Sequence, residues 1–364
     1  MKIGFDAKRI FFNRSGLGNY GRNNVLSIIA SFPDNEYFLF TPKINTTLFS
    51  AQGSKIVTPE YPILGNFWRY LSMGKTAQSL HLDVFHGLSN ELPRDIEKSK
   101  AKKIVTIHDT IFMRFPQWYK WHDRMMYRKK TIFACQHADT IVATSEQTKA
   151  DLIHFFNADK SKIEVVYQPC NQTFNTNFSQ ENLQNIRKKY ALPEQYMLMV
   201  GNIEPRKNIL SVIQAKKEQN IDLPLVIVGK KSQYLFTLEN YIQKHNIKDI
   251  FFYHCVSNEE LPIFFQLSTM LIYASHFEGF GIPIVEAMQC GVPVVVSNNS
   301  CFFETAGDAG LYFSADNIED IGTKIATVYN NESLKKQMIN NGFQQVKKFN
   351  ANTIAQQLMK IYQK

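Results

Sequence analysis

Residues 272–296 constrain the fold of this chain most, because they carry a complete strand–loop–helix–strand pattern: IYASHFEGFGIPIVEAMQCGVPVVV. Pro283 suits the first turn of the helix, Gly291 suits its end, and β-branched residues then predict the next strand. A glycine loop that opens a helix offers free backbone N–H groups to an anion, while Glu278 and Glu286 suit hydroxyl groups. The pattern indicates either a phosphate bound beside sugar hydroxyls or a plain βαβ crossover with a solvated Glu278.

Length and composition predict a globular protein of two domains. The chain has 364 residues, of which 44% are hydrophobic, and this length suits two ordinary cores better than one. No apolar run approaches membrane-spanning length, and the chain starts directly as a strand, so no signal peptide is expected. Five scattered cysteines without CxxC spacing predict reduced thiols in the cytoplasm. The formal charge of +9 suits nucleic acid, anionic lipid or phosphorylated substrates without choosing among them.

Short apolar strands alternate with helical segments, which predicts an α/β fold with doubly wound parallel sheets. The expected strands are 3–6, 36–40, 54–58, 83–85, 103–107, 139–143, 163–166, 196–200, 225–228, 250–253, 271–274 and 293–296. Helices are expected at the end of the chain, at 318–329, 333–348 and 351–364. The polar stretch 171–180 is expected to link the two domains.

The segment SGLGNYG at 15–21 contains a literal GxGxxG motif, including Gly16 and Gly18. The dinucleotide fingerprint has its glycines directly after a strand and an acid after the next strand, but residues 7–14 intervene and the next strand ends in Thr-Pro. A Walker loop is excluded because Arg-Asn stands where Lys-Ser/Thr is needed. We expect a flexible glycine loop at a helix N-terminus, serving as a structural turn or as a phosphate contact.

Histidines follow two neighbouring predicted strands of the first half. His86 follows one strand, and His108-Asp109 follows the next. Because ligands of parallel sheets lie beyond the carboxyl ends of the strands, both histidines are expected to face the same crevice. A purely structural role is the alternative for each.

Residues 111–137 mix cations with aromatic rings. Such a mixture suits an anionic interface, a lipid-linked phosphorylated acceptor or single-stranded nucleic acid. The alternative is an amphipathic helix with a solvated basic face. The candidate residues of this acceptor or membrane face are Asp109, Trp118, Trp121, Arg124, Arg128, Lys129 and Lys130.

Arg206 and Lys207 stand between a strand closed by Gly201 and the start of a helix. Cations at that end oppose the helix dipole, which favours a functional role over a solvated helix end. A planar guanidinium together with a point charge suits a diphosphate.

In the run VGNIEPRKN at 200–208, together with the pair Glu278 and Glu286, the chain resembles the retaining glycosyltransferases of family 4, or glycosyl transferases group 1, of the GT-B type. The resemblance covers nearly the whole chain and implies two Rossmann-like doubly wound domains facing each other across a cleft. It implies an acceptor domain at 1–175, a nucleotide-sugar donor domain at 176–345 and a C-terminal helix at 346–364 that crosses back to the first domain.

The resemblance also implies roles for individual residues. Arg206 and Lys207 hold the diphosphate, Glu278 contacts hydroxyls of the transferred sugar, and Glu286 binds the ribose. His108 contacts the transferred sugar and completes the catalytic set. The remaining donor contacts are Gly16, Gly18, Gly201, Gly279, Phe280 and Gly281.

The implied activity is metal-independent, retaining transfer of a hexose from a nucleotide-sugar to a saccharide or lipid-linked oligosaccharide in polysaccharide biosynthesis, without a cofactor. His108-Asp109 and the run 114–116 look similar to mannosyltransferase-like members, which favours GDP-mannose. UDP-sugars stay open, because His254-Cys255 stands where relatives often carry a glycine near a base-contacting turn. The expected location is the cytoplasm, with peripheral association to an anionic membrane face and no nucleic-acid partner. The alternatives are a nucleotide-sugar epimerase on the same fold and a basic protein that binds nucleic acid or membrane.

Overall fold

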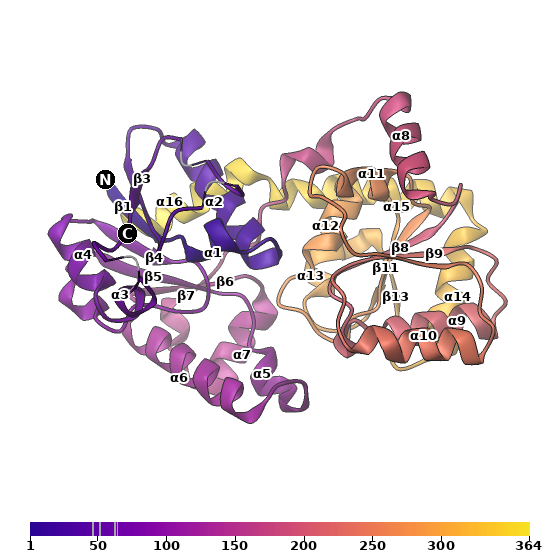
Figure 1. Ribbon diagram of the computed structural model, residues 1–364, viewed down its shortest axis with the longest axis horizontal. Coiled ribbons are helices and arrows are strands. Elements are labelled where there is room, and N and C mark those ends of the chain that lie inside the picture. The colour runs from indigo at the N-terminus through magenta and orange to yellow at the C-terminus, as the bar shows by residue number, and fades with distance from the viewer. Residues whose placement is uncertain (46, 51, 62, 64) are drawn as a thin grey trace. The chain divides into compact units, whose positions relative to one another are not determined.

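The computed structural model describes residues 1–45, 47–50, 52–61, 63 and 65–364, which form two compact units (Figure 1). Unit 1 comprises Met1–Pro169 and Phe349–Lys364, and unit 2 comprises Cys170–Lys348. The chain therefore enters unit 2 shortly before the expected boundary at 175/176. It returns to unit 1 shortly after the expected boundary at 345/346.

The described part of unit 1 contains a seven-stranded sheet in the order β3-β2-β1-β4-β5-β6-β7, and every neighbouring pair is parallel. The strands are β1 (Lys2–Asp6), β2 (Glu36–Phe40), β3 (Lys55–Val57), β4 (Val84–Gly87), β5 (Lys102–Ile107), β6 (Thr140–Ala143) and β7 (Ile163–Val165). The helices are α1 (Lys8–Phe12), α2 (Gly16–Ser31), α3 (Gly65–Leu71), α4 (Met73–Ser79), η2 (Ile96–Lys98), α5 (Ile111–Arg114), η3 (Pro116–Trp118), α6 (Trp121–His137), α7 (Glu146–Phe156), η4 (Lys160–Lys162) and α16 (Ala351–Gln363).

Unit 2 contains a six-stranded parallel sheet in the order β10-β9-β8-β11-β12-β13. Its strands are β8 (Met197–Val200), β9 (Leu225–Val228), β10 (Ile250–Tyr253), β11 (Met270–Tyr273), β12 (Val294–Ser297) and β13 (Gly310–Phe313). Its helices are η5 (Gln172–Asn175), α8 (Gln180–Tyr190), η6 (Pro205–Lys207), α9 (Ile209–Glu218), α10 (Tyr234–Lys244), α11 (Leu261–Gln266), α12 (Ile282–Gln289), α13 (Phe302–Ala306), η7 (Gly307–Ala309), α14 (Ile318–Tyr329) and α15 (Glu332–Gln345), and η8 (Val346–Phe349) leads out of the unit. The α/β class with two doubly wound parallel sheets is confirmed.

Local sequence explains where these elements begin and end. Ser145 accepts a hydrogen bond from the backbone N–H of Thr148 (3.0 Å), so it caps α7 as expected. Pro283 occupies the first turn of α12, where its missing N–H costs no hydrogen bond. Gly291 follows that helix at φ +70°, a conformation that favours glycine.

The last helix, α16, packs on α2 of unit 1, where Figure 1 shows the two side by side. Ile354, Leu358 and Tyr362 of α16 are fully or almost fully buried in the same core cluster as Phe5 of β1. Since burial of apolar surface is the main favourable term in folding, α16 belongs to the core of unit 1.

His86 belongs to that core as well, and the expectation that it faces a ligand crevice is wrong. Its ring is fully buried in β4 and lies 2.7 Å from the hydroxyl of Tyr362 and 2.9 Å from that of Thr106. Burial lowers the pKa of His86 to about 3, so the ring stays neutral. His86 thus links α16 to the sheet.

Gly16 and Gly18 do not form a flexible loop, because both lie in the first turn of α2. A Cβ atom at Gly18 would come within 1.9 Å of the Asn13 carbonyl oxygen, so the close approach of α1 and α2 requires glycine there. At Gly16 a Cβ atom would meet nothing within 4 Å. The structural reason for glycine therefore applies to Gly18 and not to Gly16.

Each strand order contains a switch point, where the chain leaves one half of the sheet and starts the other. In unit 1 the switch point lies between β1 and β4, and in unit 2 it lies between β8 and β11. Ligands of open parallel sheets bind beyond the carboxyl ends of the strands at such points. The expected ligand sites of the two units therefore lie at these two edges.

Candidate functional site

The segments that follow β8 and β11 meet at the switch point of unit 2. The backbone N–H of His276 donates to the carbonyl oxygen of Arg206 (3.0 Å), and the Arg206 guanidinium donates to the carbonyl oxygen of Phe277 (2.9 Å). These hydrogen bonds connect the turn η6 to the loop before α12. The sequence predicted both segments, and the structure brings them together.

Glu278 forms ion pairs with both cations of η6. Its Oε1 atom lies 2.5 Å from Nη1 of Arg206 and 2.6 Å from Nζ of Lys207. Lys207 also donates to the hydroxyl of Tyr273 (3.2 Å) and lies 5.0 Å from the centre of that ring. The three charged side chains expose only 11–17% of their surface, so their electrostatic interactions are weakly screened.

The pKa values of these groups follow from burial and pairing. Burial would raise the pKa of Glu278, but the nearby Lys207 and Arg206 lower it to about 2, so the carboxylate is charged. Burial outweighs the ion pair at Lys207 and lowers the pKa of its ammonium below the ordinary value. The more exposed Glu204 also lies 3.5 Å from Arg206, so the two cations face two carboxylates, of which only Glu278 is buried with them.

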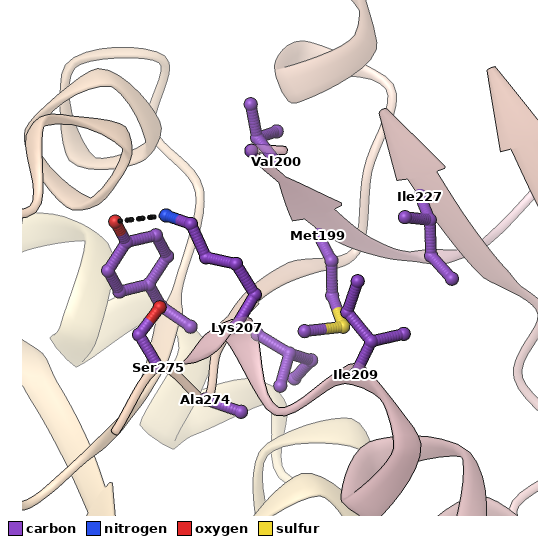
Figure 2. A pocket seen from close by; sticks show the side chains of 10 residues that line it. Met199, Val200, Lys207, Ile209, Ile227, Ala274 and Ser275 are labelled. Atoms are coloured by element: carbon purple, nitrogen blue, oxygen red, sulfur yellow. Dashed lines mark hydrogen bonds between the residues drawn. The ribbon is translucent and has the colours of Figure 1, made fainter. Parts of the chain in front are cut away.

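A small cavity lies beneath Lys207, and Figure 2 shows Met199, Ile209 and Ile227 around its apolar floor. Its volume is about 10 Å³, which is room for about one water molecule. Gly201 closes β8 at φ +141°, and a Cβ atom there would meet the Lys207 side chain at 2.8 Å. Glycine is therefore required for Lys207 to lie over the end of β8.

The loop between β11 and α12 is held by Ser300, a residue that the sequence did not indicate. The Ser300 hydroxyl accepts from the backbone N–H of Glu278 (3.2 Å) and donates to its carbonyl oxygen (2.6 Å). Gly279, Phe280 and Gly281 are buried, and Gly281 starts α12 at φ +87°. Phe280 is 2% exposed, so its ring belongs to the core of unit 2.

Glu286 on α12 is 9% exposed, and within the described residues its carboxylate has no hydrogen-bond or ion-pair partner. Burial raises its pKa to about 8. It also contributes, after burial, to raising the pKa of the Cys170 and Cys290 thiols. A buried carboxyl group without a partner is costly, which makes it a candidate for hydroxyl groups of a ligand.

His108 lies in unit 1, after β5, with 5% of its surface exposed. Its Nε2–H donates to the carbonyl oxygen of Leu88 (2.9 Å), and Tyr20 packs edge-on against the ring. Burial lowers its pKa to about 4, so the imidazole is neutral near pH 7. With the proton fixed on Nε2, the Nδ1 atom is the acceptor.

The basic–aromatic segment, residues 111–137, contains side chains that pair with other residues and side chains that are exposed. Lys130 lies 2.6 Å from Glu91, and Trp118 stacks on Phe115 with ring centres 4.3 Å apart. The Nε atom of Arg124 is buried without a hydrogen-bond partner in the described structure. The exposed side chains of α6 include Trp121, Met125, Met126, Arg128 and Lys129. No described helix has the length and apolar character needed to cross a membrane.

Comparison with protein families gives two matches that follow one another along the chain. The model described as Glycosyltransferase Family 4 matches residues 33–173, and the model described as Glycosyl transferases group 1 matches residues 182–345. The second match contains Arg206, Lys207, Glu278 and Glu286. The first contains His108 and the basic–aromatic segment.

Individual relatives agree with these matches. The chain is 26% identical over 383 residues to O-antigen chain mannosyltransferase B of Escherichia coli, covering 100% of this chain and 99% of the relative. It is 33% identical over 215 residues to O-antigen chain mannosyltransferase RfbU of Salmonella typhimurium, covering 58% of this chain and 56% of the relative. Among solved structures, a glycosyltransferase from Rickettsia africae has a TM-score of 0.78 at 17% identity, covering 99% of this chain and 97% of that one. The Anabaena protein HepE in complex with UDP-glucose has a TM-score of 0.76 at 16% identity, covering 99% of both chains.

Proposed function

This chain belongs to the glycosyltransferases of group 1 and family 4, and from that premise we propose that it moves a hexose from a nucleotide-sugar to a saccharide or lipid-linked saccharide in polysaccharide biosynthesis. The cluster of Arg206, Lys207 and Glu278 at the switch point of unit 2 carries the proposal. A nucleoside diphosphate needs preorganised positive charge as it leaves, and Arg206 and Lys207 hold two cations side by side beyond the end of β8.

In this proposal the donor lies along the carboxyl edge of the unit 2 sheet. Arg206 and Lys207 bind the diphosphate, Glu278 accepts from sugar hydroxyls, and Glu286 accepts from the ribose. Because Glu286 lacks a partner in the described structure, two hydroxyl donors would relieve its desolvation. Gly201 and the backbone of Gly279–Gly281 line the same edge.

We propose retention of configuration, with transfer on one face of the sugar and the departing phosphate accepting the proton of the acceptor hydroxyl. Glu278 is not the nucleophile in this scheme, since two cations already engage its carboxylate. The cations Arg206 and Lys207 offset the charge of the leaving group, so the scheme requires no metal ion. His108 presents its Nδ1 acceptor to a hydroxyl of the transferred sugar, and Gly16 leaves room for a phosphate beside the start of α2.

GDP-mannose is the donor we favour, because the two named O-antigen relatives are mannosyltransferases. The UDP-glucose complex of HepE keeps UDP-sugars as the alternative. A thermal-shift panel of GDP, UDP, ADP and their sugars tests both proposals, because a ligand that binds only the folded protein raises its midpoint. We expect GDP and GDP-mannose to raise the midpoint most. A larger shift with UDP would overturn the choice of base, and no shift with any nucleotide would overturn the function.

We also propose that α6 rests on the anionic cytoplasmic face of a membrane, since Trp121, Met125, Arg128 and Lys129 expose apolar and basic groups on one helix. Changing Arg128 and Lys129 to Gln should weaken binding to phosphatidylglycerol vesicles by roughly 30-fold, at about 1 kcal/mol per charge. Co-sedimentation over a salt series measures this. The control changes Lys244 and Lys248, two exposed lysines of unit 2, to Gln. Equal losses in both pairs would show that only net charge matters.

A further inference from the structure

A series of buried polar side chains connects the last helix of the chain to the ring of His108. The hydroxyl of Tyr362 on α16 lies 2.7 Å from Nδ1 of His86 on β4, and Nε2 of His86 lies 2.9 Å from the hydroxyl of Thr106 on β5. The Thr106 hydroxyl also lies 3.0 Å from that of Tyr20 on α2. The Tyr20 ring packs edge-on against the ring of His108, with ring centres 4.5 Å apart. The contacts are thus continuous from α16 to His108, and they lie within unit 1.

These polar groups lie in an apolar core. Each of the five residues exposes at most 5% of its surface, and Tyr20 and Tyr362 belong to the same core cluster as Phe5. Burying a polar group costs free energy unless it is hydrogen-bonded, and an apolar core of the same shape would pack as well. A satisfied polar network instead fixes one arrangement of the groups that it joins. Its presence therefore calls for a role beyond packing.

All three hydrogen bonds of this network can form at once, because its members are neutral. Burial and, to a smaller extent, the nearby His108 lower the pKa of His86 to about 3. Burial also raises the pKa of Tyr20 and Tyr362, so both hydroxyls keep their protons. The three hydroxyls and the neutral imidazole carry four hydrogens, and three hydrogen bonds need three. Because Thr106 stands between His86 and Tyr20, its hydroxyl couples the orientations of both rings.

The backbone and the ring of His108 are held in different ways. Its backbone N–H donates to the side-chain oxygen of Asn90 (2.7 Å), and its carbonyl oxygen accepts from the hydroxyl of Thr144 (2.9 Å). On the ring, Nε2–H donates to the carbonyl oxygen of Leu88 (2.9 Å). That hydrogen bond restricts the ring at one point, whereas the edge-on contact with Tyr20 restricts its tilt. The tilt decides where Nδ1 points.

We propose that this hydrogen-bonded network positions the ring of His108, so that Nδ1 points to the transferred sugar. The inference rests on the proposed function, in which His108 accepts from a hydroxyl of that sugar. The members of the network act through His108 and do not contact the substrate themselves. These positioning residues are Tyr20, His86, Thr106 and Tyr362. The last helix then serves the activity of unit 1 as well as its stability.

Removal of single hydroxyls tests the proposal in steady-state kinetics. Thr106→Val removes the central hydroxyl and keeps nearly the same side-chain shape. We expect it to lower kcat roughly tenfold and to leave KM for the donor unchanged, because the donor binds to unit 2 in the proposed function. Tyr362→Phe breaks the network at its far end and should lower kcat roughly two- to fivefold. Thr106→Ser keeps the hydroxyl and should restore kcat. Tyr20→Phe breaks the same hydrogen bond as Thr106→Val, so it provides the test if the valine variant does not fold.

NMR of the chain labelled with ¹⁵N at histidine supplies a readout that a packing defect would not change. We expect the ring signals of His108 to show the Nε2–H form in the wild type, and to broaden and shift in Thr106→Val and Tyr20→Phe, because the ring then changes its tilt. The control is Tyr37→Phe. Tyr37 is a 2% exposed residue of the same core cluster, and its hydroxyl donates to the carbonyl oxygen of Phe32 (2.6 Å). This variant loses a comparable hydrogen bond but should keep wild-type kcat and wild-type His108 signals.

Two outcomes would overturn the proposal. One is wild-type kcat and wild-type His108 signals in both Thr106→Val and Tyr20→Phe, and the other is an equal loss of kcat in Tyr37→Phe and Tyr362→Phe. The NMR measurement needs no turnover, so it keeps the two proposals separate. Normal transfer with unchanged His108 signals in the variants would refute the positioning alone. No transfer by the wild type, with displaced His108 signals in Thr106→Val, would refute the proposed function alone.

Discussion

Lys207→Ala is expected to lower the rate of transfer by roughly 10²- to 10³-fold, the loss typical for one preorganised group that stabilises developing charge. The Nζ atom of Lys207 lies 2.6 Å from Glu278, at the place where the diphosphate would leave. The variant should stay folded, because Glu278 keeps its ion pair with Arg206 (2.5 Å) and no buried charge is left unpaired. Turnover of the donor selected by the nucleotide panel measures the effect. The control is Lys217→Ala, on the helix that follows Lys207.

Glu278→Ala is expected to change transfer and nucleotide binding in opposite directions. Transfer should be lost, since no carboxylate then positions the sugar. Binding of the nucleoside diphosphate should tighten, because Arg206 and Lys207 lose the buried carboxylate that pairs with both of them in the free protein. We therefore expect a larger thermal shift with diphosphate in Glu278→Ala than in the wild type, and a smaller one in Lys207→Ala. Wild-type turnover in both variants would refute the site.

A chelator should leave wild-type turnover unchanged, and a loss restored only by added metal would refute the metal-free scheme.

The sheet strands could be predicted well because each is an apolar run bounded by polar or glycine residues. Strands β2, β9 and β10 have the expected bounds, whereas β13 was missed. Its sequence, Gly-Leu-Tyr-Phe, is short and starts with a residue that disfavours strands. The short helices α1, α3 and α4 were also missed, because five to seven residues carry too little periodicity to show a helix.

The candidate site could be predicted as a set of residues but not as a cluster of interactions. Strand-end positions placed Arg206, Lys207 and Glu278 at one sheet edge, since that follows from the parallel βαβ pattern. That Glu278 would pair with both cations depends on side-chain conformations that spacing does not encode. The network of Asp6, Arg69, Glu91 and Lys130 was missed for a related reason, because its members are far apart in sequence and meet only through the sheet order.

His86 and His108 also show that strand positions in the sequence do not reveal how a side chain packs. Both follow the strand pattern in the same way, yet His86 is enclosed by α16, which lies more than two hundred residues later in the chain. Only the packing of that last helix separates a structural histidine from a candidate one.

Glu286→Gln is expected to change stability in a pH-dependent way. The pKa of Glu286 is raised by burial from 4.5 to about 8, so between these values the folded protein holds a proton that the unfolded chain has released. Wild-type stability therefore falls as the pH rises through this window. Glutamine cannot ionise and removes this dependence. Above pH 8 the variant should gain up to about 5 kcal/mol, at 1.36 kcal/mol per pH unit, and below pH 4.5 it should gain nothing from this source.

The same variant should bind the donor nucleotide roughly 10- to 100-fold more weakly, because ribose hydroxyls stabilise an ionised carboxylate, whereas an amide offers them one acceptor oxygen and no charge. Melting temperatures at pH 5 and pH 9, each with and without nucleotide, measure both effects. Glu239→Gln on α10 is the control, because Glu239 is exposed and its loss removes the same charge. A stability gain without weaker binding would identify Glu286 as a buried acid with no ligand role. Weaker binding without the pH-dependent gain would mean that its carboxylate is already charged when it meets the ribose.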